Sequence, residues 1–169
     1  MATRLKNLSD FDPASLPSGK DYVFSLIVSE WNPEVTLSLA AAARDTLLNA
    51  GAVEENILMY MVPGSFELPL AAAWAAEDAE VHAILCLGCI IQGETRHFEF
   101  ISQAVAQGIT RVSLDTHVPV IFGVLTTDTL EQAQDRSGGK HGNKGVEAAV
   151  AALKMLALQQ ELLGSDEVS

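Results

Sequence analysis

The residues best suited to chemistry lie in the segment GCIIQGETRHFE, residues 88–99. Gly93 frees the backbone, and Glu94 and Thr95 present backbone N–H groups where a helix is expected to begin. Such N–H groups suit an anion, and His97 adds a group that can take or give a proton. The segment therefore predicts an anion site with an acid/base residue beside it. The alternative is that Gly93 only makes a turn and that His97 is an exposed helix residue, and this motif alone leaves it open.

Two other segments carry aromatic rings. Trp31 lies in SEWNPE, residues 29–34, where a ring can cover a planar heterocycle at the edge of a sheet. Phe66 and Glu67 lie in VPGSFELP and offer a second ring and a carboxylate. Each has a plainer interpretation, because most tryptophans pack against a core and an acidic residue at a helix N-terminus stabilises that helix. Neither segment by itself identifies a ligand.

Basic residues gather near a glycine-rich stretch, SGGKHGNKG, residues 137–145. Arg136 precedes it at the expected end of a helix, where a cation is favourable in any case. The stretch is not a phosphate loop of the GxxxxGK[ST] type, because Lys140 is followed by His141 and a helix, not a strand, comes before it. A GxGxxG motif is also absent from the sequence. Both observations weaken a nucleotide-binding function.

The two cysteines, Cys86 and Cys89, form a CxxC motif, which is typical of redox pairs and of half a zinc site. Both fall in a hydrophobic run that resembles a strand, where side chains three residues apart point to opposite faces. No second Cys/His cluster accompanies them in the sequence. We therefore predict two buried thiols and no metal site.

The candidate residues lie in loops that follow four expected strands. The strands are predicted at residues 22–29, 57–62, 82–91 and 119–126, and the helices at 34–50, 66–79, 95–115, 129–136 and 146–163. This alternating order predicts an α/β fold with a mostly parallel sheet and helices on both faces. Ligands of such sheets bind at the carboxyl ends of the strands, which is where the candidate loops lie.

Two local signals mark where helices begin. Asn32 followed by Pro33 predicts an N-cap and a proline in the first turn of a helix that ends at Gly51. Asp128 and Glu131 have the spacing of a capping box for the short helix at 129–136.

Composition limits the classes of protein and of partner. A chain of 169 residues with 49% hydrophobic content predicts one domain, at residues 21–164, between a flexible N-terminal tail at 1–20 and a C-terminal tail at 165–169. The net charge of −12 repels nucleic-acid backbones and anionic lipid surfaces, so neither is expected as a partner. With no signal-peptide pattern and no apolar run long enough for a membrane span, we expect a cytoplasmic protein.

Three motifs in order resemble the lumazine synthase family over residues 22–163: VPGSFELPLAA (62–72), GCIIQGETRHF (88–98) and PVIFGVLTTDTLEQAQDRSGGKHGNKG (119–145). The resemblance implies a three-layer αβα sandwich with a four-stranded parallel, flavodoxin-like sheet. It also implies a transferase of riboflavin biosynthesis that needs no cofactor. Its substrates would be 5-amino-6-ribitylaminouracil and 3,4-dihydroxy-2-butanone 4-phosphate, and its products 6,7-dimethyl-8-ribityllumazine, phosphate and water.

The resemblance also implies roles for individual residues. His97 matches the residue that donates and accepts protons. The residues that match the pyrimidine and ribityl site are Trp31, which would stack on the ring, and Ser65, Phe66, Glu67, Cys89, Ile90 and Ile91.

Glu94 and Thr95 match the phosphate-binding turn. Phe122 and Arg136 match residues of a neighbouring subunit that close the site over the ring and the phosphate, and Lys144 matches the substrate-binding lysine of the GNKG turn.

Two positions depart from the family pattern. Gln92 stands where many relatives have arginine, and Glu94 stands where alanine or glutamine is common. The first removes a cation near the phosphate turn, so we expect Arg136 to carry more of the anion binding. The second is tolerable only if the Glu94 side chain points away from the phosphate.

The resemblance further implies a homo-oligomer of at least five subunits with shared sites. Because SGGKHGNKG carries no insertion, a 60-subunit icosahedral shell is favoured over a free pentamer, and riboflavin synthase is a candidate partner. A non-catalytic flavin-binding protein or shell is the alternative; it would need Trp31 and Phe122 but not His97, Thr95 and Arg136. A flavodoxin-like FMN carrier is disfavoured, because SEWNPE has no glycine for a phosphate loop.

Overall fold

The computed structural model describes residues 9–164 and contains a four-stranded sheet. Its strands are β1 (Phe24–Ser29), β2 (Ile57–Val62), β3 (Ala83–Ile91) and β4 (Val120–Thr127). They pair in the order β2-β1-β3-β4, and every pair is parallel. This is the strand order of a flavodoxin-like sheet, so the predicted fold class is confirmed.

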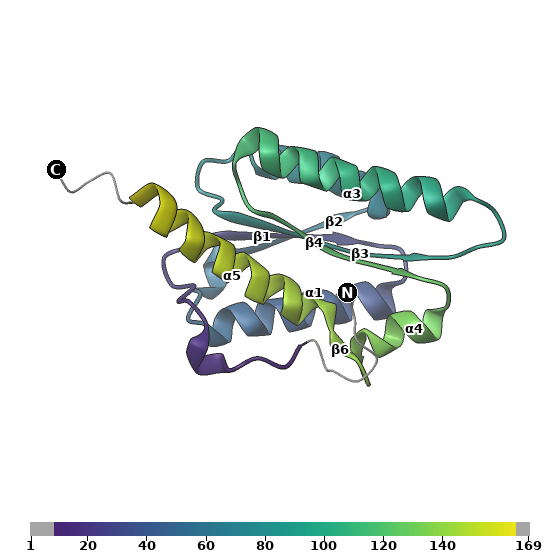
Figure 1. The fold of residues 1–169 in the computed structure, drawn as a ribbon, viewed down its shortest axis with the longest axis horizontal. Helices are drawn as coiled ribbons and strands as arrows, with labels where there is room; N and C mark the ends of the chain where they lie inside the picture. The colour runs from purple at the N-terminus through teal and green to yellow at the C-terminus, as the bar shows by residue number, and fades with distance from the viewer. Residues whose placement is uncertain (1–8, 165–169) are drawn as a thin grey trace.

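Helices cover both faces of the sheet, which makes the three layers of an αβα sandwich (Figure 1). One face carries α1 (Pro33–Asn49), α4 (Leu130–Asp135) and α5 (Lys144–Leu163), and the other carries α2 (Leu68–Ala75) and α3 (His97–Thr116). The remaining elements are short: the 3-10 helices η1 (Pro13–Ser15), η2 (Glu54–Asn56) and η3 (Ser65–Glu67), and an antiparallel pair, β5 (Ser137–Gly139) and β6 (Gly142–Asn143).

Successive residues of the central strands alternate between two hydrophobic cores. Leu85 and Leu87 belong to the core under α1 and α5, whereas Ile84 and Cys86 belong to the core under α2 and α3. Strands buried on both faces account for the nearly continuous apolar sequence of β1 and β3.

The CxxC motif is a pair of buried free thiols, as predicted. Cys86 lies in the core under α2 and α3, and Cys89 in the opposite core. Burial raises the pKa of Cys86 to about 12, and burial together with the charge of Glu34 raises that of Cys89 to about 11. Among residues 9–164 no three His, Cys, Asp or Glu side chains gather in a way that could hold a metal ion.

Asn32 occupies the predicted N-cap position, but its side chain does not cap the helix. The helix does begin at Pro33, but Asn32 has left-handed backbone angles (φ 58°, ψ 56°) and its side chain makes no capping hydrogen bond. Its Nδ2 instead donates to the carbonyl oxygen of Cys89 at 3.3 Å. A contact with a residue 57 positions away outcompetes the local cap.

The predicted capping box is displaced by one residue. Thr129 is the N-cap, and its Oγ1 accepts from the backbone N–H of Gln132 at 3.2 Å. The Gln132 side chain in turn accepts from the backbone N–H of Asp128 at 2.9 Å. Threonine and glutamine thus serve the same purpose as the predicted acidic residues.

The helix predicted at 66–79 is shorter. It divides into η3 and α2, which ends at Ala75. The residues after α2 form turns instead of a helix. In the last turn before β3, the Asp78 carboxylate accepts from the backbone N–H of Glu80 at 3.0 Å.

Part of the expected N-terminal tail lies against the domain. Gly19 is buried beside Ala52 and Leu153, and its N–H donates to the Ala50 carbonyl at 2.9 Å. Residues 1–8 and the tail at 165–169 lie outside the described residues, and the boundaries at 21 and 164 stay a prediction. No helix within residues 9–164 is long and apolar enough to cross a membrane.

Gly145 joins α5 to α1 and gives the first stability prediction. A Cβ at this position would collide with the Leu39 carbonyl, and the Gly145 N–H also donates to the Asn143 side chain at 2.8 Å. We expect Gly145→Ala to lower the free energy of unfolding by roughly 1–3 kcal/mol or more, since the helices must separate. Gly164→Ala is the control, because its Cβ would meet only Gln160 at 3.8 Å. Urea unfolding measures both, and equal stability of the two variants would contradict the prediction.

Candidate active site

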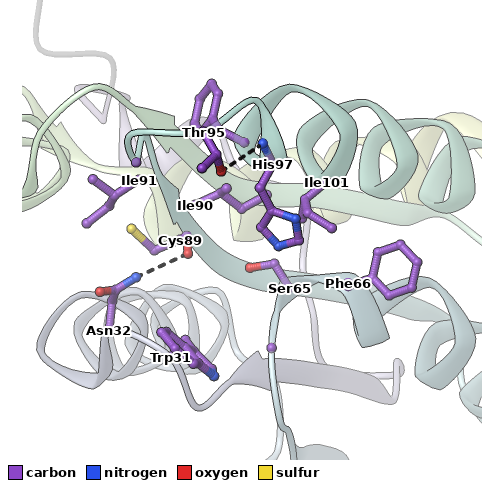
Figure 2. A pocket seen from close by; sticks show the side chains of 13 residues that line it. Trp31, Asn32, Ser65, Phe66, Cys89, Ile90, Ile91, Thr95, His97 and Ile101 are labelled. Carbon is purple, nitrogen blue, oxygen red and sulfur yellow. Dashed lines mark hydrogen bonds between the residues drawn. The ribbon is translucent and has the colours of Figure 1, made fainter.

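The strand order creates a crevice at the carboxyl ends of β1 and β3. The chain passes from β1 to β2 on one side and then returns to place β3 on the other, so the loops after β1 and β3 diverge. A cavity of about 520 Å³ lies there, within the size range of small-molecule sites. Its lining consists of Trp31, Asn32, Gly64, Ser65, Phe66, Cys89, Ile90, Ile91, Gly93, Thr95, His97, Phe98 and Ile101 (Figure 2).

The cavity brings together residues that the sequence analysis took from three separate segments. Trp31 follows β1, Ser65 and Phe66 follow β2, and Cys89, Ile90, Ile91, Thr95 and His97 come from the end of β3 and from the loop and helix after it. The two rings remain available for a ligand, since Trp31 is 72% exposed and Phe66 56%. Exposed aromatic rings beside buried strand ends suit a flat, partly polar molecule.

His97 is the first residue of α3 and extends over the cavity from one side (Figure 2). Its backbone N–H donates to the Thr95 hydroxyl at 3.4 Å, which orders the turn after Gly93. The His97 imidazole therefore lies at the mouth of the cavity, next to the helix N-terminus and to the turn that contains Thr95. This is an arrangement that can bind an anion and move a proton near it.

Ser65 provides a polar group that lacks a partner inside the protein. The residue is only 7% exposed, it lines the cavity, and its Oγ makes no hydrogen bond to any described residue. A buried hydroxyl without a partner is costly, and because the Oγ itself is fully covered, a bound ligand would reach it only after the side chain turns toward the cavity.

Gly88 makes room for Ser65 and was missed by the sequence analysis. A Cβ at this position in β3 would lie 2.6 Å from the Ser65 Oγ and 2.9 Å from the Leu68 Cδ1. A glycine inside an otherwise bulky apolar strand was the available signal, because such a residue often marks a close approach. Asn32 was also missed as a site residue, since it was assigned to a helix cap.

Five predicted site residues do not line this cavity. Glu67 and Glu94 lie in its loops but outside its lining, and Phe122 is partly buried against the core under α2 and α3. Arg136 and Lys144 line a different hollow of about 460 Å³ beside the end of β4. One copy of the chain therefore separates its His97 from these two cations.

The two cations share one carboxylate. Arg136 Nη2 lies 2.6 Å from Glu147 Oε1, and Lys144 Nζ lies 3.2 Å from Glu147 Oε2. Arg136 Nη1 also donates to the His141 carbonyl at 2.6 Å. With the Arg136 and Glu147 side chains each 17% exposed, this ion-paired group is largely shielded from solvent.

The fold and the cavity define an α/β protein with a small-molecule site at the switch point of its sheet. Residues 21–160 match the model of a protein family described as 6,7-dimethyl-8-ribityllumazine synthase. A relative with that name from Porphyromonas gingivalis is 53% identical over 160 residues, covering 95% of this chain and 99% of the relative. One from Cytophaga hutchinsonii is 55% identical over 157 residues, covering 93% and 98%. One from Flavobacterium johnsoniae is 45% identical over 161 residues, covering 95% and 85%.

The chain belongs to the 6,7-dimethyl-8-ribityllumazine synthase family. The resemblance found in its three motifs is therefore confirmed, as is the expectation of an enzyme of the transferase class.

The contact between Gly88 and Ser65 gives a paired stability prediction. We expect Ser65→Ala to change the free energy of unfolding by less than about 1 kcal/mol, because the lost hydroxyl has no partner to leave behind. Gly88→Ala should cost roughly 1–3 kcal/mol by overpacking. In the double variant part of that cost should disappear, because the closest atom to the new methyl group is gone. Additive effects in denaturant unfolding would contradict the contact.

Proposed function

We propose that this chain condenses 5-amino-6-ribitylaminouracil with 3,4-dihydroxy-2-butanone 4-phosphate to form 6,7-dimethyl-8-ribityllumazine. One observation carries the proposal: two exposed rings, an unpartnered hydroxyl and His97 meet in one cavity of a chain in this family. Rings suit the pyrimidine, and the hydroxyl suits the polyol chain. The helix N-terminus at His97 suits the phosphate.

The reaction needs positioning and proton transfer. The pyrimidine's amine adds to the ketone and water leaves, which forms an imine. Loss of a proton and elimination of phosphate follow, and the ribitylamino nitrogen then closes the second ring with loss of a second water. His97 would take and return the protons, a contribution of ~10² to 10⁴ in rate, and holding the two substrates together would supply much of the rest.

Other cavity residues would bind and orient the pyrimidine. Trp31 would stack on it, and the ends of β2 and β3 would contact its ring and ribityl chain. These contacts would come from Ser65, Phe66, Glu67, Cys89, Ile90 and Ile91. Thr95 would bind the phosphate with the N–H groups of its turn. Glu94 is exposed and outside the cavity lining, which is compatible with a phosphate beside it.

We further propose that a neighbouring copy of the chain completes the site. Arg136 and Lys144 are held by Glu147 at a hollow apart from the cavity of their own chain, so their cationic groups suit the phosphate of the next subunit, with Phe122 closing over the ring. A head-to-tail contact of this kind closes into a ring. Five chains of 18.0 kDa would give about 90 kDa, and a 60-subunit shell about 1.1 MDa. The uninterrupted SGGKHGNKG turn favours the shell, and riboflavin synthase stays a candidate partner.

Incubation of the protein with both substrates tests the proposed function. Lumazine absorbance and released phosphate should rise together in a 1:1 ratio, with no product when either substrate is omitted. Riboflavin binding without turnover would replace the proposal by the non-catalytic flavin-binding alternative.

His97→Ala should fold and bind the pyrimidine but lose one to three decades of kcat, roughly, because positioning survives while proton transfer does not. Steady-state kinetics with both substrates measures the loss. The control is His117→Asn, because this exposed imidazole lies before β4, at the end of the sheet opposite the cavity, and asparagine tolerates its left-handed backbone. A His97 variant with parental turnover would remove this residue from the mechanism.

Mixing two impaired variants tests whether the site is shared. For Arg136→Ala we expect a KM increase for the ketose phosphate of about tenfold or more, from a lost charge-assisted hydrogen bond. When this variant and His97→Ala are unfolded, mixed and refolded together, some interfaces should combine the intact His97 of one chain with the intact Arg136 of another. At a ketose phosphate concentration well below the parental KM, activity should therefore exceed that of either variant refolded alone.

Light scattering shows whether the mixture forms assemblies of at least five chains. If assemblies form and no activity returns, Arg136 and His97 do not act across an interface.

A further inference from the structure

Asn32 is the residue that connects the two diverging loops at the switch point. Its backbone is left-handed, a conformation that only Asn32 and His117 adopt among the non-glycine residues at 9–164. It lines the cavity directly after Trp31, and its side chain reaches across to β3 (Figure 2). Non-glycine residues with such backbone angles concentrate at functional sites, where the surrounding structure holds them in place.

The Asn32 side chain donates a hydrogen bond to β3 beyond the point where the pairing between β1 and β3 ends. The register between β1 and β3 ends at Val28 and Leu87, two residues before Cys89. The next N–H after β1, that of Glu30, turns to the other neighbouring strand and donates to the Val62 carbonyl at 2.8 Å. The Asn32 Nδ2 supplies the donor for the Cys89 carbonyl at 3.3 Å.

Trp31 thus lies between two anchored residues. Glu30 is attached to β2 through its backbone, and Asn32 is attached to β3 through its side chain. The Trp31 ring itself is 72% exposed, so packing alone does not fix it. The position of the ring therefore depends on the backbone of Glu30 and Asn32. Of the two anchors, only the one on β3 is made by a side chain, that of Asn32.

We propose that Asn32 is a positioning residue of the active site, which holds the Trp31 ring and the Cys89 carbonyl in fixed relation across the cavity. It acts through these two residues and not on the reacting atoms. The first part concerns the structure alone, whereas the consequence for the pyrimidine rests on the proposed function.

Few residues can meet both demands of this position. The left-handed backbone favours glycine, asparagine and aspartate. Glycine has no side chain, and an ionised aspartate has no hydrogen to donate. The helix start does not need the side chain, because the Asn32 carbonyl already accepts from the N–H groups of Val35 and Thr36 at 2.9 and 3.0 Å.

Three substitutions separate positioning from folding. Asn32→Gly keeps the backbone angle and removes the donor, and Asn32→Asp keeps the angle and nearly the shape but also removes the donor. Asn32→Ala removes the donor and disfavours the angle. A positioning role predicts a common defect in all three variants. A purely structural role predicts a defect in Asn32→Ala alone.

The first measurement needs no substrate. In a Trp74→Phe background Trp31 is the only tryptophan, and its time-resolved fluorescence anisotropy reports the freedom of the ring. We expect a larger fast component in Asn32→Gly and Asn32→Asp than in the Trp74→Phe parent, with a clear loss of Tm in Asn32→Ala only. Unchanged anisotropy in Asn32→Gly and Asn32→Asp would overturn the proposal.

The second measurement uses the proposed substrates. The KM for 5-amino-6-ribitylaminouracil should rise about tenfold in Asn32→Gly and Asn32→Asp, while kcat at saturation stays within about threefold, since a binding contact and not proton transfer is lost. A fall in kcat of about tenfold in both variants, without a change in KM, would overturn the positioning role. If the parent shows no turnover, the proposed function fails, and the anisotropy result still decides the role of Asn32.

Discussion

The reversal of strand order at β1 is the constraint on which the rest of the molecule depends. Because β2 and β3 lie on opposite sides of β1, the loops that leave β1 and β3 cannot pack against each other, and a cavity remains between them. The same reversal leaves the last carbonyl groups of β3 without strand partners from β1. The reversal of strand order therefore explains both the cavity and the hydrogen bond that Asn32 donates to β3.

Electrostatics impose a second constraint. A chain with net charge −12 disfavours an anionic substrate at long range, so anion binding must come from local groups. The described structure holds two: the start of α3 near Thr95 and the Arg136–Glu147–Lys144 cluster. They lie at different hollows of one chain, and bringing them together requires a second copy. The proposed oligomer would therefore complete the charge of the anion site as well as the shape of the cavity.

The sequence by itself determined the class of fold, and it did so through short-range physics. Continuous apolar runs predicted strands buried on both faces, and the alternation of strands with helices predicted parallel pairing. The spacing of Cys86 and Cys89 predicted their opposite orientation, which places them in separate cores. The sequence also located the loops that line the cavity, because in a parallel sheet all ligand-facing loops follow strands.

Tertiary structure alone decided what the side chains in those loops do. The local sequence predicts that the Asn32 side chain caps a helix, yet this side chain donates to a carbonyl 57 residues away. Gly88 is a glycine because Ser65 of η3 and Leu68 of α2 approach it, and the Arg136 side chain is held by Glu147 and by the His141 carbonyl. A sequence pattern reports what neighbours along the chain favour. Partners distant in sequence are set by how the layers close, and their contacts were strong enough to override the local preference.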